Sequence, residues 1–158
     1  MTDTNSIGLH AGSASQLAEK LNDLLANYQI FYMNVRGYHW NVKGSDFFQL
    51  HEKFEELYTD LLTKVDEVAE RILTLGHQPV HAYTDYLKLS NIKEDKNVSD
   101  GSACVKGVLE GYQTLIELQR EVLALASDAD DEGTAAQAGD YIREQEKTVW
   151  MLGAYLSK

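Results

Sequence analysis

The sequence predicts an all-α fold of four long helices, with a long connection carrying a short helix between the second and the third. Apolar residues recur at steps of three and four over most of the chain, a spacing typical of amphipathic helices. The 158 residues include a single proline, a residue that interrupts helices. A chain of this length suits one domain around one core. We expect a flexible tail over residues 1–12 and one helical domain over residues 13–158.

The turns between the helices are marked by particular residues. Ser13 or Ser15 can cap the first helix, and Gly44 supplies a turn before the second. Gly76 ends the second helix. The stretch that follows is too long for a tight link between antiparallel neighbours, so we expect it to cross the length of the bundle. The expected helices cover residues 13–40, 47–75, 83–89, 100–127 and 134–156.

Composition excludes several classes of function. The net charge is −11 and the isoelectric point is near 4.8, so a general nucleic-acid-binding surface is not expected, whereas cations would be attracted. No apolar run is long enough to span a membrane, and residues 1–13 lack the basic and apolar regions of a signal peptide. We therefore expect a cytoplasmic protein. Because Cys104 is the single cysteine, an intramolecular disulfide is excluded. We expect Cys104 to be a small buried side chain in a helix.

The stretch from Phe47 to Leu75 carries a second pattern beside its apolar row. His51, Glu55, Asp66 and Glu70 form a stripe that flanks the core-facing side of this helix. His51 and Glu55 are one turn apart, as are Asp66 and Glu70, so each pair could hold one side of a metal ion.

The two pairs cannot meet within one straight helix. His51 and Asp66 are separated by roughly 22 Å along the axis at 1.5 Å rise per residue. They would meet if two copies of the helix packed antiparallel across a two-fold axis. This predicts a metal site shared by two chains. The alternative, a charged face in contact with water, stays open at this point because long helices rich in Glu and Lys commonly have one.

The dipeptide His39-Trp40 provides a third candidate. It precedes the second helix by a short turn, so His39 should lie close to His51 and Glu55. Imidazole and carboxylate ligands together suit divalent iron, zinc or manganese. The alternatives are a hydrogen-bonded histidine at a helix end and, for Trp40, an aromatic anchor in the core.

Three short motifs in this order and spacing resemble the signature of the Dps mini-ferritins, the DNA-binding proteins from starved cells. They are YHWNVKG at residues 38–44, LHE at residues 50–52 and DEVAER at residues 66–71. The likeness extends from about Leu17 to Leu156. It implies a ferritin-like four-helix bundle that assembles into a hollow homododecamer, with ferroxidase sites at the two-fold dimer interfaces.

The resemblance also implies a division of the site between chains. His39, His51 and Glu55 would come from one subunit, and Asp66 and Glu70 from its neighbour. Two irons would bind at each site, where Fe(II) is oxidised with hydrogen peroxide as the preferred oxidant. The ferric product would be stored as mineral inside the shell, protecting the cell against oxidative stress.

Two further positions of the site follow from the same resemblance. Trp40 would be the oxidisable aromatic residue that the family places beside the metals. Glu55 departs from the family, which usually has Asp at this position. Glutamate keeps the charge and the donor atoms but adds a methylene group, so the geometry or affinity of metal binding is expected to differ.

An acidic turn precedes the last helix. Asp128, Asp130, Asp131 and Glu132 resemble the residues that line the family's three-fold pores, where negative charge would raise the local concentration of ferrous ions. The alternative is capping of the last helix and compensation of its dipole. Both interpretations stay open on the sequence.

DNA binding is the weaker part of the resemblance. Family members that bind DNA often use a terminus rich in Lys and Arg, but residues 1–19 contain neither, and only Lys158 lies at the other end. We expect no direct DNA condensation at physiological salt, although divalent cations could bridge weak binding and allow association with the nucleoid. Two rival hypotheses remain: a DNA-compacting protein with incidental iron chemistry, and a helical bundle whose charged stripe is only solvated.

Overall fold

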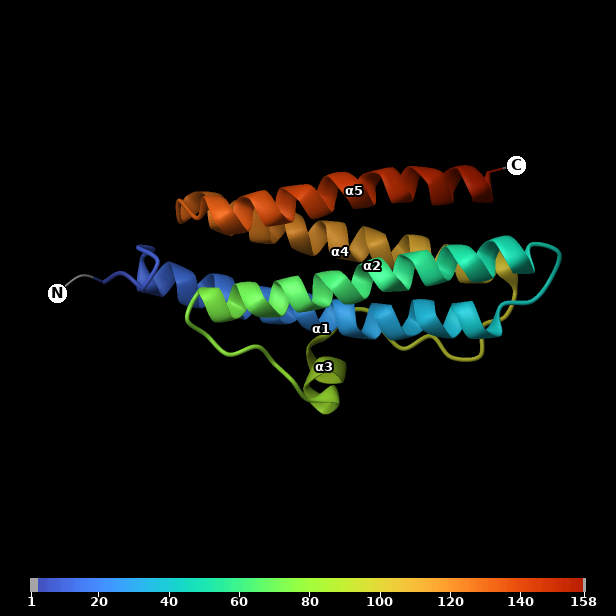
Figure 1. Ribbon diagram of the computed structural model, residues 1–158, viewed down its shortest axis with the longest axis horizontal. Coiled ribbons are helices and arrows are strands. Elements are labelled where there is room, and N and C mark those ends of the chain that lie inside the picture. Colours follow the sequence, from blue (N-terminus) through green and yellow to red (C-terminus); the bar gives the residue numbers. More distant parts are fainter. Residues whose placement is uncertain (1–2, 158) are drawn as a thin grey trace.

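The computed structural model describes residues 3–157, and Figure 1 shows that they form a bundle of long helices with one short helix on its side. The all-α class, the bundle of four long helices and the short helix in the crossover are confirmed. The observed boundaries lie within two residues of the expected ones. The helices are α1 (Ala11–Asn41), α2 (Phe47–Thr74), α3 (Tyr83–Leu89), α4 (Gly101–Asp128) and α5 (Glu132–Leu156).

The connectivity explains the long crossover. Helix α1 packs against α2, and α4 packs against α5, each as an antiparallel pair (Figure 1). Helices α2 and α4 run in the same direction, so the chain must return along the bundle before α4 can begin. The returning segment carries α3, which packs on α1 at the side of the bundle away from α5.

The start of α1 differs from the expectation. The helix begins at Ala11, and its cap is His10, whose Nδ1 accepts a hydrogen bond from the backbone N–H of Ser13 at 3.2 Å. Neither Ser13 nor Ser15 is the cap, because both lie inside the helix. An imidazole nitrogen can accept the capping hydrogen bond as a serine hydroxyl does. Residues 3–9 form a loop closed by an isolated bridge between Thr4 and His10. The flexibility of residues 1–12 stays a prediction, and residues 1 and 2 lie outside the described part.

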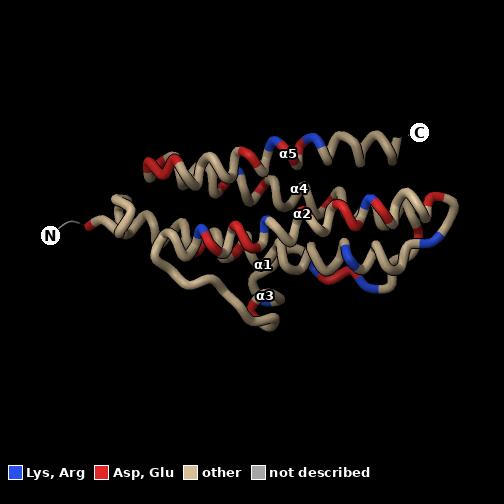
Figure 2. The backbone as a smooth tube through the Cα atoms, viewed as in Figure 1, with Lys and Arg blue, Asp and Glu red and all other residues tan. Residues whose placement is uncertain are grey.

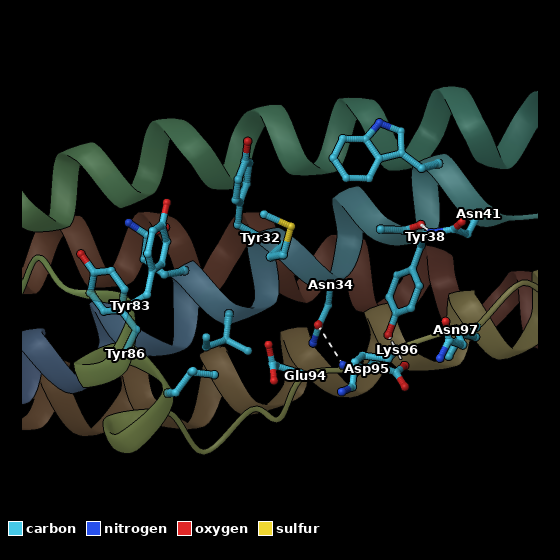
Figure 3. A pocket seen from close by; sticks show the side chains of 17 residues that line it. Tyr32, Asn34, Tyr38, Asn41, Tyr83, Tyr86, Glu94, Asp95, Lys96 and Asn97 are labelled. Carbon is cyan, nitrogen blue, oxygen red and sulfur yellow. Dashed lines mark hydrogen bonds between the residues drawn. The ribbon is translucent and has the colours of Figure 1, made fainter.

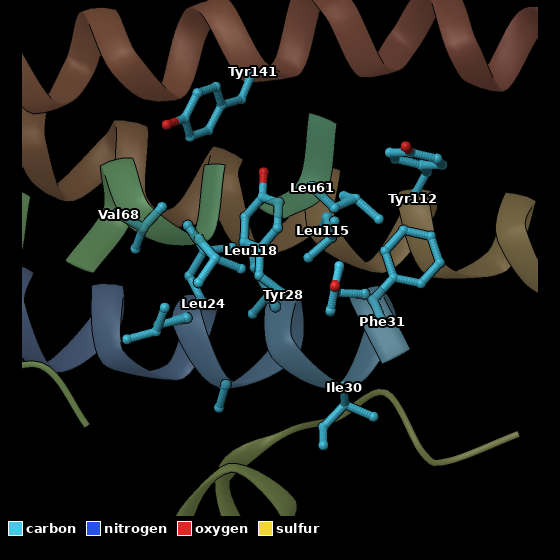
Figure 4. Packing of buried hydrophobic residues seen from close by; sticks show 14 of the residues in the cluster. Leu24, Tyr28, Ile30, Phe31, Leu61, Val68, Tyr112, Leu115, Leu118 and Tyr141 are labelled. Carbon is cyan, nitrogen blue, oxygen red and sulfur yellow. The ribbon is translucent and has the colours of Figure 1, made fainter. Parts of the chain in front are cut away.

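The core joins all four long helices through aromatic and aliphatic side chains (Figure 4). The ring of Phe31 packs edge-on against Tyr112, with centroids 4.9 Å apart. A polar triad lies inside this apolar cluster. The Tyr28 hydroxyl bonds to Gln119, and Gln145 donates to that hydroxyl at 2.8 Å and accepts from Gln119 at 2.8 Å. Every polar side-chain atom of the triad therefore has at least one hydrogen-bond partner despite its burial.

Three asparagines of α1 fasten the crossover to the bundle. Asn22 donates to the carbonyl of Gln78 and accepts from the N–H of Val80. Asn34 makes the same two-way contact with the carbonyl of Lys93 and the N–H of Asp95. Asn27 accepts from the N–H groups of residues 91 and 92. These amides supply partners to irregular backbone that no helix or sheet satisfies.

Two glycines let α4 approach α1 closely. A Cβ atom at Gly111 would lie 2.1 Å from a ring carbon of Phe31, and one at Gly107 would lie 2.2 Å from the Tyr38 hydroxyl. Both distances are far below van der Waals contact. The two glycines lie one turn apart on α4, so both face α1 at this contact.

Charged residues are spread along the outside of the bundle (Figure 2). Acidic residues gather in the sequence where α5 begins, at the turn that the sequence singled out (Figure 2). Among residues 3–157, none of the helices is both long and apolar enough to cross a membrane. Cys104 is fully buried, as expected, and burial raises the pKa of its thiol to about 11.

We predict that Gly111→Ala lowers the free energy of unfolding by about 1–3 kcal/mol, because the added methyl group overpacks the contact with Phe31. Urea unfolding followed by circular dichroism measures the change. Gly139→Ala is the matched control, since a Cβ there meets nothing within 4 Å inside α5. Its effect should be within about 1 kcal/mol and stabilising. Equal effects of the two substitutions would contradict the close contact.

A candidate metal half-site where α1 meets α2

The end of α1 and the start of α2 bring two histidines together. Gly44, with a φ of 117°, forms the turn between the helices, and this backbone conformation favours glycine. The turn places His39 on α1 against His51 on α2. Their rings stack with centroids 3.9 Å apart and planes inclined by 12°. His39 is buried and His51 is half-buried.

Two crossed hydrogen bonds fix both rings. Nδ1 of His39 lies 2.6 Å from the carbonyl oxygen of His51, and Nδ1 of His51 lies 2.7 Å from the carbonyl oxygen of His39. A carbonyl oxygen only accepts hydrogen bonds, so each Nδ1 must carry the hydrogen. In the neutral rings, both Nε2 atoms then keep a free lone pair. This is the state in which a histidine binds a metal, with its other nitrogen held by a backbone oxygen.

Glu55 completes this group. Its Oε1 lies 3.7 Å from Nε2 of His39, and its side chain is 60% exposed. Two imidazole rings and one largely exposed carboxylate therefore lie near one another, although this chain alone does not place them to hold a metal ion. The extra methylene of glutamate does not prevent the carboxylate from reaching His39. This is the grouping expected from the sequence for one chain.

The other two predicted ligands lie elsewhere on α2. Asp66 and Glu70 are exposed and belong to the second half of the helix. Along the helix axis they lie roughly 22 Å and roughly 28 Å from His51. Within residues 3–157, no group of three or more His, Cys, Asp or Glu side chains is placed to hold a metal by itself. A single chain therefore presents two separate half-sites, one at each end of α2.

The Glu70 end has its own polar surroundings. Glu67, Glu70 and Asp140 line an open depression of about 410 Å³ between α2 and α5. The Tyr141 hydroxyl donates to Glu67 at 2.7 Å, and this bond together with burial raises the pKa of Tyr141. Asp140 pairs with Arg143 at 3.2 Å, so of these three carboxylates only that of Glu70 has no hydrogen bond or ion pair within residues 3–157.

An aromatic cage adjoins the His39 half-site, and the sequence reasoning missed its central residue. The guanidinium of Arg36 lies 5.1 Å from the ring centroids of both Trp40 and Tyr58. Tyr58 in turn packs edge-on against His39, with centroids 5.3 Å apart. Trp40 is 58% exposed, so the core-anchor alternative for Trp40 is wrong. The available signal was the spacing of Arg36 and Trp40, one helical turn apart on α1.

A groove of about 490 Å³ runs from this cage toward the crossover (Figure 3). Tyr32 and Tyr38 of α1 and Tyr83 and Tyr86 of α3 contribute to its wall. The Tyr38 hydroxyl donates to Asp95 on the crossover. Burial and this hydrogen bond raise the pKa of Tyr38. The groove is aromatic and lies on the same side of α1 as Trp40.

The acidic turn divides into two kinds of residue. Asp131 is 2% exposed and caps α5, accepting from the N–H of Thr134 at 3.0 Å and from Arg71 at 2.8 Å. The capping interpretation is therefore confirmed for Asp131. Asp128, Asp130 and Glu132 are exposed, so their carboxylates face solvent at the end of the bundle.

The fold is that of a ferritin-like protein, a four-helix bundle whose long helices carry the candidate histidine and carboxylate ligands. The family model described as a ferritin-like domain matches residues 18–158. The chain belongs to the Dps branch of this family, the mini-ferritins, as its relatives show.

Relatives and solved structures agree over nearly the whole chain. A DNA protection during starvation protein of Porphyromonas gingivalis is 40% identical, covering 96% of this chain and 95% of its own. An uncharacterised protein of Haemophilus influenzae is 62% identical over 94% of this chain and 93% of its own. The crystal structure of a Dps protein from Vibrio cholerae, described as ferritin-like and diiron-carboxylate, is 54% identical. It matches with a TM-score of 0.97, covering 99% of each chain.

We predict that, in the metal-free protein at neutral pH, the neutral forms of His39 and His51 carry their hydrogen on Nδ1. The two carbonyl acceptors require this form. Nitrogen NMR of protein labelled at histidine distinguishes the protonated from the bare ring nitrogen. His39→Gln and His51→Gln samples assign the signals. Hydrogen on Nε2 of either ring would contradict the crossed hydrogen bonds.

Proposed function

We propose that this protein is a ferroxidase and an iron-storage mini-ferritin. The observation that carries the proposal is the pair of crossed hydrogen bonds, which leaves Nε2 of His39 and Nε2 of His51 free beside Glu55. Such an N,N,O set suits ferrous iron, and carboxylate oxygen also suits the ferric product. The relatedness to Dps proteins and to a diiron-carboxylate structure supports the same chemistry.

In the proposed reaction, two ferrous ions are the substrate and hydrogen peroxide is the preferred oxidant. Each iron gives up one electron, and the two electrons with two protons convert one peroxide into two water molecules. Transfer of electrons in a pair avoids release of hydroxyl radical. The histidines and carboxylates bind and position the irons, while the change of redox state belongs to the metal.

We assign the site to two chains. His39, His51 and Glu55 come from one subunit, and Asp66 and Glu70 from a second copy packed antiparallel along α2. Three features support this assignment: the two half-sites at opposite ends of α2, the absence of a complete ligand group within residues 3–157, and the exposure of Asp66 and Glu70. Two irons per site would then have five ligand side chains.

The remaining sequence assignments fit this proposal. Trp40 is exposed beside His39, a position from which its ring could supply an electron. Asp128, Asp130 and Glu132 are free to attract ferrous ions at a pore of the assembly, whereas Asp131 is occupied by Arg71 and its own helix. The proposed assembly is a cytoplasmic homododecamer whose hollow interior stores ferric mineral and so protects against oxidative stress.

Direct DNA binding is not part of the proposal, although several relatives carry DNA protection in their names. A chain with a net charge of −11 repels phosphate unless cations intervene. Protection of DNA would then be chemical, through removal of ferrous iron and peroxide. A gel-shift assay at low and physiological salt, with and without magnesium, separates this from DNA compaction.

We predict that His39→Ala and Asp66→Ala each reduce ferrous oxidation by peroxide to the rate in buffer, because each removes a ligand from every site. If the two variants are unfolded together and reassembled as a mixture, about one quarter of the sites regain a complete ligand set. Absorbance of the ferric product after rapid mixing measures the recovery.

The control for this mixture is each variant refolded alone, which should stay inactive. A second control, Glu117→Gln, alters an exposed carboxylate of α4 outside the proposed site and should keep the original rate. If the mixture gains no activity while each variant alone assembles normally, the assignment to two chains fails. Full activity of both single variants would remove the site altogether.

A further inference from the structure

The guanidinium of Arg36 has no carboxylate partner within residues 3–157. It takes part in none of the ion pairs formed by residues 3–157. Its Nε atom is shut off from water and has no hydrogen-bond partner. The guanidinium lies against the rings of Trp40, Tyr58 and Tyr32, and Nη1 donates to the Tyr32 hydroxyl.

The other three arginines, Arg71, Arg120 and Arg143, each pair with a carboxylate. Acidic residues number 25 and basic residues 14, so carboxylates are abundant. The aromatic faces attract the guanidinium, but they do not supply the acceptors that a partly desolvated cation needs. The side chain is only partly buried, so the outer N–H groups of its fork remain open to an acceptor from outside the chain.

The proposed antiparallel dimer indicates which acceptor arrives. If His51 and Glu55 face Asp66 and Glu70 of the partner subunit, the two-fold axis crosses α2 between residues 60 and 61. Tyr58, which packs on Arg36, then lies opposite residue 63 of the partner's helix. Measured along the axis of the partner's helix from residue 63, Asp66 of the partner subunit is offset by roughly 4.5 Å. Glu70 of the partner subunit is offset by roughly 10 Å.

We infer that Arg36 forms an ion pair with Asp66 of the partner subunit. The inference rests on the two-chain arrangement of the proposed function but concerns the protein before iron binds. Three carboxylates would otherwise crowd together at each empty site, from Glu55 of one subunit and Asp66 and Glu70 of the other. Arg36 offsets this repulsion and holds one carboxylate oxygen, which leaves the second oxygen facing the histidines. Arg36 is thus a positioning residue of the site.

A double-mutant cycle in metal-free protein tests the ion pair. Arg36→Gln and Asp66→Asn should each raise the protein concentration at which half of the chains are assembled by about tenfold. If the two side chains act as a pair, the double variant also shows a rise of about tenfold. Independent side chains would instead give about a hundredfold rise. Sedimentation of protein diluted in chelator-containing buffer measures all four forms.

Two further variants test whether the effect depends on the charge of Arg36 and on Asp66 in particular. Arg36→Lys keeps the charge and should raise the assembly midpoint by no more than about threefold. Arg36→Gln combined with Glu117→Gln should be no different from Arg36→Gln alone. If Arg36→Gln fails to fold by circular dichroism, the cycle is run with Arg36→Lys against Asp66→Asn.

Additive effects, or no effect of either substitution, would overturn the ion pair. Because no iron is present, the result does not depend on ferroxidase activity. A coupled pair in a protein that fails to oxidise iron would refute the proposed function and leave the inference standing. A protein that oxidises iron but shows no coupling between Arg36 and Asp66 would refute the ion pair and leave the proposed function standing.

Discussion

The two hydrogen bonds that cross between His39 and His51 are the constraint on which the half-site depends. Each ring is tied to the backbone of the other residue, so neither ring can turn without breaking its own hydrogen bond. They join the last turn of α1 to the first turns of α2 and set the direction of both Nε2 atoms. The position of Glu55 and the edge contact with Tyr58 follow from this arrangement. Under the proposed function, iron would bind at these two helices without rearrangement of the rings.

Much of the fold could be predicted from the sequence because the signals of a helix, its apolar spacing and its end residues, lie within a short stretch of chain. The apolar spacing and Gly76 set the extent of α2, and Asp100 marks the start of α4 as its cap. The short helix at residues 83–89 was predicted at its observed position. The half-site could also be predicted, since His51 and Glu55 lie on one helix and His39 is a short turn away. These relations depend on a few neighbouring residues.

Contacts between helices could not be read in the same way. Gln119 and Gln145 look like surface residues in the sequence, yet they are buried because each finds its partner on another helix or on Tyr28. Arg36 is similar, since its surroundings depend on the distance between α1 and α2. The asparagines that hold the crossover are matched to backbone groups some sixty positions away. Such partners exist only after folding, and an assembled site exists only after a second chain arrives.

The division of ligands between the ends of α2 has a consequence for newly made protein. A newly folded single chain has no group of three or more His, Cys, Asp or Glu side chains within residues 3–157 that is placed to hold a metal ion. Under the proposed function, it would hold ferrous iron weakly and could not pair two irons for oxidation. Iron chemistry would then begin only when two chains have met, at the place where a shell is being built. Ferric product made before assembly would have no cavity to receive it and would precipitate in solution. Because the site is divided between two chains, no iron would be oxidised there before they meet.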